Sequence, residues 1–519
     1  METLNNQSNL SLDSERNRIS TFVRAILTLV TAYMLTSILF RMLDDQRYSL
    51  PLMIAVSALF LLTLVFGLIH GARLRVTSVV ALLLGLSAGA FAWLNSEQFF
   101  SQYLYLHVLV VSYTIFTLSL FGNANRTLSG GTFLLDAIKA TFVYPFLSFI
   151  SIFLSLFQWK RGSKRTGRIV LFSLIGVIAA LILGIIAVSL LSFDAAFAKL
   201  FEIDWDWKNL PETIAKIIVC IPLAALLFGT FTSSEQKKLP NMSSPEKAER
   251  IGTRMKKAHP VIFLIPIVVL LVIYGLFFFT QWDVYMSAFS GVLPSSYTAA
   301  EYARSGFFEL CAVAAINALF GIVMSLFMNE TSRAAGILKR IANTLLALAT
   351  LILIATALSK MILYIRRFDL TVLRLFVSVI LVLIGIGFLV SVLSQWIRKI
   401  KTAPVLIVII SALLLVTPFL NVYGRIAKYN VDAYLARAEQ NVPDNAIDIY
   451  YLSNDLGDAA IPELVRLYQS GAFPQEKKQK VLELLSSDYS RLIAYKSTDH
   501  SLQSKKALDA LESVKGDLT

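Results

Sequence analysis

The stretch from Gln281 to Met328 holds polar side chains that could do chemistry at a membrane boundary. Glu301 and Arg304 precede an apolar segment of membrane-spanning length, and Glu309 lies one turn inside it. A carboxylate within a span commonly marks a functional site, although the positive end of a helix dipole also stabilises an acid near a helix start. The sequence therefore predicts Glu301, Arg304 and Glu309 as ligand-binding residues, and it leaves a structural role for Glu309 open.

A second set of candidates is basic and interrupts an otherwise regular charge pattern. Lys360, Arg366, Arg367 and Arg374 lie near one predicted membrane surface, together with Tyr364. Guanidinium and ammonium groups at this depth could hold a phosphate or a lipid headgroup. Long basic side chains that reach from the membrane to water explain the pattern nearly as well.

Asp44 and Asp45 follow the first predicted span. An acid pair in this position is similar to that of membrane glycosyltransferases that use polyprenyl-linked sugars. The 41–49 loop is too short for the usual acceptor-binding helix, so solvated loop acids are favoured.

Other signatures of catalysis are missing from the sequence. It contains no Gly-rich phosphate loop, nucleophile elbow or HExxH motif. The four histidines have no metal-ligand spacing, and His107 is predicted to make a packing hydrogen bond rather than to relay protons. Cys220 and Cys311 lie in predicted spans, and Asn317 lies among small residues that favour close helix packing. We expect no catalytic residues, metal or cofactor.

These candidates must be positioned by membrane helices. The 519 residues are 56% hydrophobic and 16% charged, with a mean hydropathy of +0.68, whereas soluble proteins are about 25% charged. We predict an all-α polytopic membrane protein with about 11 spans of roughly 20 residues. The spans are 22–40, 50–70, 76–94, 103–121, 169–192, 211–232, 260–281, 306–328, 338–358, 373–396 and 402–420.

The distribution of charge predicts the orientation. A net charge of +13 could indicate nucleic-acid binding in a soluble chain, but here Lys and Arg concentrate in alternate loops, as in cytoplasmic loops. The polar segment 1–20 is then cytoplasmic, and the C-terminus is extracytoplasmic. Segment 131–157 contains Asp136, Lys139 and Pro145, so we predict an interfacial or re-entrant helix. If it crosses, the orientation downstream is inverted.

The predicted domains follow from these spans. Residues 21–232 form a first membrane half with six spans, 233–258 a basic cytoplasmic loop, and 259–420 a second half with five spans. Residues 421–519 are near neutral and carry helical periodicity, so they predict a small soluble helical domain outside the membrane. Within it, Asn430 is predicted to cap the helix VDAYLARAEQ.

Four stretches carry a family resemblance: LPSSYTAAEYARSGFFEL (293–310), MILYIRRFDLTVLRL (361–375), NVYGRIAKYNVDAYL (421–435) and DIYYLSNDLGDAAIPEL (448–464). Together they resemble bacterial multi-span membrane proteins catalogued only as a domain of unknown function. The resemblance covers roughly residues 170–470 and implies a bacterial inner-membrane protein, with no established activity. It departs at Phe368 and Asp369, where the family leads us to expect Tyr-Gly.

Three hypotheses of function follow. The first is non-enzymatic binding or movement of a small polar or lipidic ligand at an outer-facing site, with the bilayer and an anionic or isoprenoid lipid as partners. The second is a lipid-linked transferase that uses Asp44 or Asp45. The third is a membrane sensor or assembly scaffold whose C-terminal domain meets a protein partner.

Overall fold

The computed structural model confirms an all-α membrane protein. In the part of the chain that the structure describes, ten helices are long and apolar enough to cross a membrane, and they match every predicted span except 169–192, which lies outside the described residues. The described part of the chain has no strand beyond one isolated bridge between Ala258 and Met328. The described residues are 2–43, 49–95, 99–122, 138, 141–156, 210–236, 250, 254–280, 282, 307–329, 332–397, 399–440, 446–471, 475–494 and 500–518.

The chain divides into two compact units. The first comprises residues 1–126, 133–241 and 495–502, and the second comprises residues 127–132, 242–494 and 503–519. The division between residues 241 and 242 falls in the basic loop 233–258. The C-terminal helical domain belongs largely to the second unit, which also contains the membrane helices from residue 261 onward.

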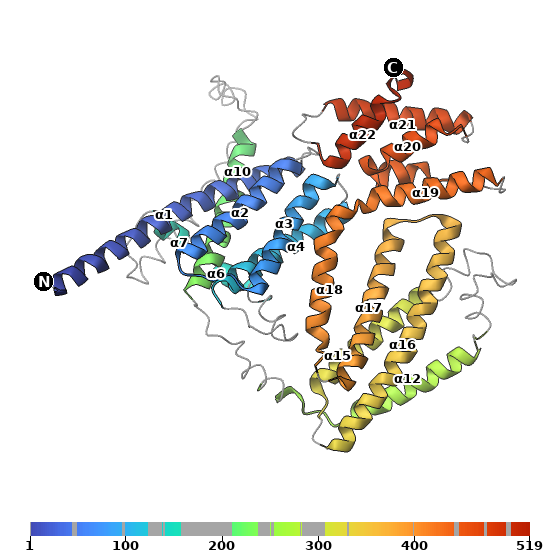
Figure 1. Cartoon of the computed structure of the whole chain (residues 1–519), viewed down its shortest axis with the longest axis horizontal. Coiled ribbons are helices and arrows are strands. Elements are labelled where there is room, and N and C mark those ends of the chain that lie inside the picture. The colour runs from blue at the N-terminus through green and yellow to red at the C-terminus, as the bar shows by residue number, and fades with distance from the viewer. Residues whose placement is uncertain are drawn as a thin grey trace, which may run out of the picture. The chain divides into compact units, whose positions relative to one another are not determined.

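The first unit is a bundle of long helices. Its α3 packs between α2 and α4, and α1 packs across α10 (Figure 1). Phe60 of α2 contacts Tyr113 and Phe116 of α4 at ring distances of 5.6 and 5.4 Å, which places an aromatic core inside this bundle. The helices are α1 (Glu2–Leu43), α2 (Ser49–Ile69), α3 (Val76–Leu94), α4 (Phe99–Leu120) and α10 (Leu210–Glu235).

The described part of segment 131–157 is a broken helix in this unit. It forms two short pieces, α6 (Tyr144–Leu147) and α7 (Ser151–Leu156), which pack against α10. A Cβ atom on Gly229 of α10 would lie 2.3 Å from the Pro145 carbonyl oxygen, so only glycine allows this approach. At the break, the Ser233 hydroxyl donates to the Ser148 hydroxyl at 2.8 Å.

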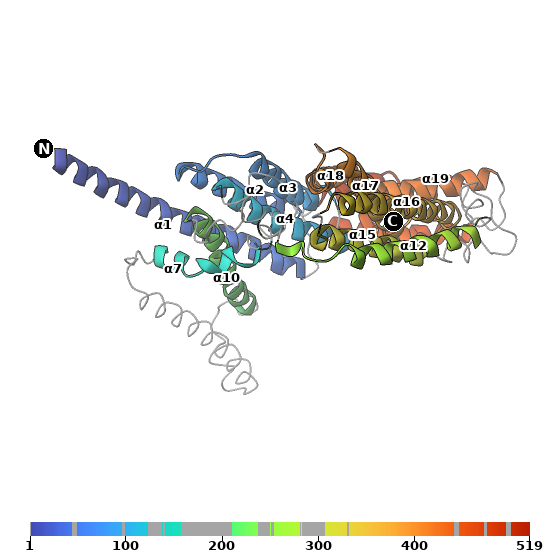
Figure 2. The same cartoon turned by 90° about the horizontal axis from the view of Figure 1, so that it is seen from below.

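The second unit is built around α16, which packs against α12, α15 and α17 (Figures 1 and 2). The helix begins at its cap Ser332, whose side chain accepts from the Ala335 amide at 3.0 Å. It continues past residue 358, the end of the predicted span, and its length of about 54 Å exceeds a hydrocarbon core of about 30 Å. These helices are α12 (Val261–Thr280), α15 (Phe307–Phe327), α16 (Arg333–Phe368), α17 (Val372–Trp396) and α18 (Thr402–Val416).

The C-terminal helices form their own hydrophobic core, which includes Leu456, Leu464, Val481 and Leu485. The main elements are α19 (Val422–Glu439), α20 (Ile461–Gln469), α21 (Gln475–Ala494) and α22 (Leu502–Glu512), followed by the short α23 (Lys515–Leu518). Between α19 and α20 the chain forms the single turns Tyr451–Asp455 and Gly457–Ala459, and a further single turn, Thr417–Leu420, joins α18 to α19.

The start of α19 corrects one prediction. Asn430 was predicted to cap a helix from residue 431, but α19 begins earlier, and its cap is Asn421. Asn421 adopts a left-handed conformation with φ of 45°, and its side chain accepts from the Gly424 amide at 3.3 Å. A Cβ atom on Gly424 would lie 2.5 Å from that side chain, so a larger residue here would displace the Asn421 cap. Asn430 is instead buried in the middle of the helix.

Candidate functional site

The turn between α16 and α17 is the place where the C-terminal domain meets the membrane helices. We name residues 369–371 the docking turn. Asp369 has φ of 63° and ψ of 170°, a conformation that favours glycine. The carboxylate of Asp369 forms an ion pair with Arg437 of α19 at 2.9 Å. Burial raises the pKa of Asp369 above its ordinary value of 3.8, and the nearby Arg437 and Arg374 only partly oppose this shift.

Two further contacts attach the C-terminal domain to the docking turn and its neighbour Val372. The Asn430 side chain accepts from the Leu370 amide at 2.7 Å and donates to the Leu370 carbonyl oxygen at 2.9 Å. The Val372 amide donates to the Tyr451 hydroxyl at 2.7 Å. Burial raises the pKa of Tyr451 to about 12, so the phenol is neutral at physiological pH. Leu370, Val372 and Leu375 also pack against the core of the domain.

These contacts join three of the stretches that carry the family resemblance. Leu370 belongs to 361–375, Asn430 to 421–435 and Tyr451 to 448–464, and the three stretches meet at the docking turn. The resemblance leads us to expect Tyr-Gly at positions 368 and 369. A glycine at position 369 has a structural reason, because Asp369 occupies a backbone conformation that glycine adopts without strain.

Arg374 and Tyr364 lie together beside this turn. The Arg374 guanidinium donates to the Phe368 carbonyl oxygen at 2.5 Å and to the Asp369 carbonyl oxygen. It also stacks on the Tyr364 ring at 4.3 Å, and Tyr364 contacts Phe368 edge to face. Arg374 therefore satisfies the carbonyl groups that end α16, so its position has a structural explanation.

The other predicted site residues are dispersed. Glu309 is exposed in the first turn of α15, whereas Lys360 of α16 is only 6% exposed, and the two groups interact electrostatically. Arg366 and Arg367 are exposed in the last turn of α16. Glu301 and Arg304 lie outside the described residues. Of the described residues of this predicted site, Glu309 and Lys360 interact with each other, and Arg366 and Arg367 are exposed.

The first unit contains a buried charge cluster that the sequence reasoning missed. Arg24 of α1 is 4% exposed and forms an ion pair with Glu235 of α10 at 3.2 Å. Its guanidinium also donates to the Thr232 hydroxyl at 3.2 Å and lies over the rings of Phe228 and Phe231, at 4.6 and 4.1 Å. The sequence did contain a signal for this cluster, because Arg24 lies inside the apolar run 22–40. An arginine inside a membrane span is rare and usually pairs with another group.

His70, which directly follows α2, lies beside this Arg24 cluster. Its Nε2 atom lies 3.7 Å from the Glu235 carboxylate, and its Nδ1 atom donates to the Phe66 carbonyl oxygen at 2.7 Å. A carbonyl oxygen can only accept, so the hydrogen on Nδ1 is fixed by geometry. Glu235 of α10 therefore lies between Arg24 of α1 and the His70 ring that follows α2.

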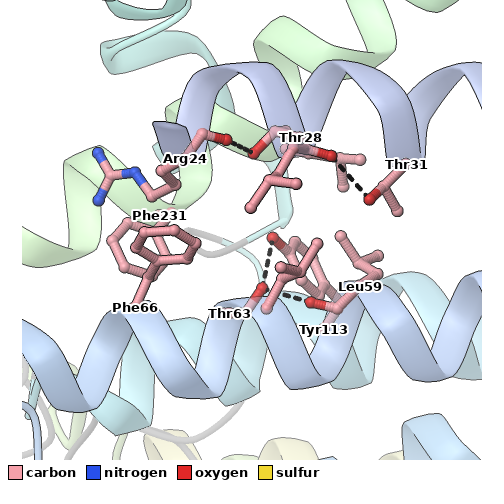
Figure 3. A pocket seen from close by; sticks show the side chains of 11 residues that line it. Arg24, Thr28, Thr31, Leu59, Thr63, Phe66, Tyr113 and Phe231 are labelled. Carbon is pink, nitrogen blue, oxygen red and sulfur yellow. Dashed lines mark hydrogen bonds between the residues drawn. The ribbon is translucent and has the colours of Figure 1, made fainter. Parts of the chain in front are cut away.

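A small cavity lies beside the Arg24 cluster (Figure 3). Its walls include Arg24, Thr28, Thr31, Thr63 and Tyr113, and the space open to the centre of a water molecule is about 20 Å³. Each threonine hydroxyl donates to a carbonyl oxygen of its own helix at 2.8 Å, which leaves its lone pairs available. The Thr63 hydroxyl also lies 3.3 Å from that of Tyr113. This volume and these polar partners suit one water molecule.

Other polar residues in the spans have structural partners. Asn317 accepts from the Tyr274 hydroxyl at 2.8 Å and donates to Thr350 at 2.9 Å, which links α12, α15 and α16. The Nδ1 atom of His107 lies 2.7 Å from the Tyr103 carbonyl oxygen one turn earlier. No group of metal-binding side chains occurs in the described part of the chain. Asp44 and Asp45 lie outside it.

Comparison with known proteins identifies a family without an assigned activity. No curated protein and no solved structure significantly matches the chain. The match to a family described as "Domain of unknown function (DUF4153)" spans residues 78–467, and thus includes helices of both units and the docking turn. The protein is an integral membrane protein that belongs to this family.

Proposed function

We propose that the protein is a non-enzymatic membrane sensor or assembly scaffold that acts through its C-terminal domain. In this account a protein partner binds the domain, and the docking turn passes the resulting change to α16 and α17. The observation that carries the proposal is the set of contacts from Arg437, Asn430 and Tyr451 to the docking turn and Val372. A rigid contact between a soluble domain and a helix hairpin is a physical route for coupling.

The charges near the docking turn favour this function over a closed ligand site. Arg374 and Tyr364 contact the end of α16, and Lys360 is buried. Among the described basic residues of the predicted ligand site, Arg366 and Arg367 are therefore the remaining candidates for binding a small polar or lipidic ligand. The proposed orientation places the N-terminus in the cytoplasm and the C-terminal domain outside a bacterial cytoplasmic membrane.

The test distinguishes loss of the C-terminal domain from loss of its contacts with the docking turn. In host cells that lack their own copy, one compares the full chain, a truncation after residue 420, and an uncoupled variant with Asn430→Ala and Arg437→Ala. The readout is growth under envelope stress, scored under conditions where the deletion has a phenotype. The matched control is Arg425→Ala with Tyr429→Ala, which removes one arginine and one polar side chain from the exposed face of α19.

The proposal predicts that the uncoupled variant is as defective as the truncation, while the control complements the deletion. Equal membrane abundance of all four proteins is verified by immunoblotting. Full complementation by the truncation would place the function in the membrane helices. Full complementation by the uncoupled variant, with a defective truncation, would show that the domain acts without this coupling.

A further inference from the structure

The last turn of α16, a helix long and apolar enough to span a membrane, carries two exposed cations, Arg366 and Arg367. Within the described part of the chain, neither side chain forms an ion pair or hydrogen bond. Cations are favoured at a helix C-terminus because they complement the helix dipole. Here Arg374 already donates to the carbonyl oxygens of Phe368 and Asp369, so helix capping does not account for the other two arginines.

The surface around these arginines is apolar. Ile362 lies one turn before Arg366 on the same face of α16, and Phe368 follows the arginine pair. Leu373 lies in the first turn of α17 on the other side of the docking turn, and all three apolar side chains are exposed. Guanidinium groups next to exposed apolar side chains match a ligand that has an anionic head and a hydrocarbon body.

We propose that Arg366 and Arg367 bind the phosphate of an anionic phospholipid, whose acyl chains lie along the exposed apolar side chains at the ends of α16 and α17. The occupant is a lipid rather than soluble phosphate, because the cations adjoin apolar membrane helices. The arginine geometry suits phosphate oxygens, since each guanidinium can donate two parallel hydrogen bonds. This site is separate from the docking contacts and goes beyond the proposed coupling.

Native mass spectrometry of the full chain can test this site. The protein is titrated with phosphatidylglycerol and, separately, with phosphatidylcholine, and the dissociation constant of the first bound lipid is determined. An attraction of about 1 kcal/mol per basic residue makes each single variant, Arg366→Gln or Arg367→Gln, about fivefold weaker for phosphatidylglycerol, and the double variant about thirtyfold weaker. Binding of phosphatidylcholine is expected to stay unchanged.

The matched control is Arg333→Gln with Arg340→Gln, which removes two exposed arginines from the opposite end of the same helix. It is expected to bind phosphatidylglycerol within about twofold of wild type, because these positions are outside the proposed site. An equal loss in both double variants would show nonspecific charge attraction and overturn the proposal. An unchanged affinity in the Arg366 and Arg367 double variant would also overturn it.

Inorganic phosphate distinguishes the two sources of the anion. At millimolar concentration it is expected to leave phosphatidylglycerol bound, whereas displacement would indicate a soluble phosphate site and contradict the lipid proposal. Melting temperatures of all variants are compared without added lipid. If the double variant is destabilised, the single variants decide, and the absence of a loss in either would overturn the proposal. These outcomes do not depend on a protein partner for the C-terminal domain.

Discussion

Asn430 of α19 pairs with both backbone groups of Leu370 in the docking turn. Its side-chain amide donates to the Leu370 carbonyl oxygen at 2.9 Å, and its oxygen accepts from the Leu370 amide at 2.7 Å. A carboxamide therefore replaces the two partners that a β-ladder would supply to this residue. Through these two hydrogen bonds, Asn430 attaches the C-terminal domain to the hairpin formed by α16 and α17.

Asn430→Ala is expected to destabilise the second unit. It leaves the Leu370 amide and carbonyl without these partners, and each unsatisfied buried group costs about 1–3 kcal/mol. Thermal unfolding in lipid nanodiscs measures the loss. Tyr429→Ala, on the exposed side of the same helix, is the control and should melt close to wild type. Equal melting temperatures of the two variants would show that the Asn430 contacts add no stability.

Asp369→Gly and Asp369→Ala separate backbone strain from the ion pair. Both variants lose the contact with Arg437, but only glycine adopts φ of 63° and ψ of 170° readily. The glycine variant should therefore be more stable than the alanine variant by about 1 kcal/mol or more. Chemical denaturation of the two proteins compares them directly, and a less stable glycine variant would contradict the assigned conformation.

The stability contributed by Asp369 should increase as the pH falls. Burial raises the pKa of this carboxyl group above 3.8 in the folded protein. A group with a raised folded pKa contributes most below its unfolded pKa, and that contribution is lost as the pH rises through its folded pKa. The melting temperature of wild type minus that of Asp369→Asn should therefore grow between about pH 7.5 and about pH 4.5. A shrinking difference would show that Arg437 outweighs burial.

Arg24→Leu should be among the most destabilising single substitutions in the first unit. It leaves Glu235, whose side chain is 25% exposed, without its arginine partner, so the loss should lie below the roughly 3–5 kcal/mol of a fully buried pair. Adding Glu235→Leu should restore part of that loss, because no unpaired charge then remains. Thermal unfolding tests both variants, with the exposed Arg333→Leu as the control. An additive loss in the double variant would argue against a coupled pair.

The sequence predicted the membrane helices better than the contacts between them. Apolar runs of about 20 residues are local signals, so ten spans agree with the structure. The helical character of residues 421–519 was also predicted, because apolar periodicity is a local feature; the structure has α19, α20, α21 and α22 there. These signals are sufficient because each depends on residues close in the chain.

Contacts between distant residues could not be predicted in the same way. Asn430 resembles a helix cap by residue type, but its partner Leu370 is 60 positions away. Arg24 and Glu235 are separated by 211 positions, and only the unusual depth of Arg24 gave a warning. Arg374 was predicted as a ligand-binding residue because of its charge, but the sequence could not reveal that it contacts the end of α16.

Amide hydrogen exchange at Leu370 and Val372 tests the central claim most directly. Both amides donate to side chains of the C-terminal domain, Asn430 and Tyr451, so their protection reports docking. We predict slow exchange in the full chain in nanodiscs and rapid exchange after truncation at residue 420, while amides in the middle of α16 remain protected. Equally rapid exchange at both positions in the full chain would contradict the docking and the coupling that depends on it.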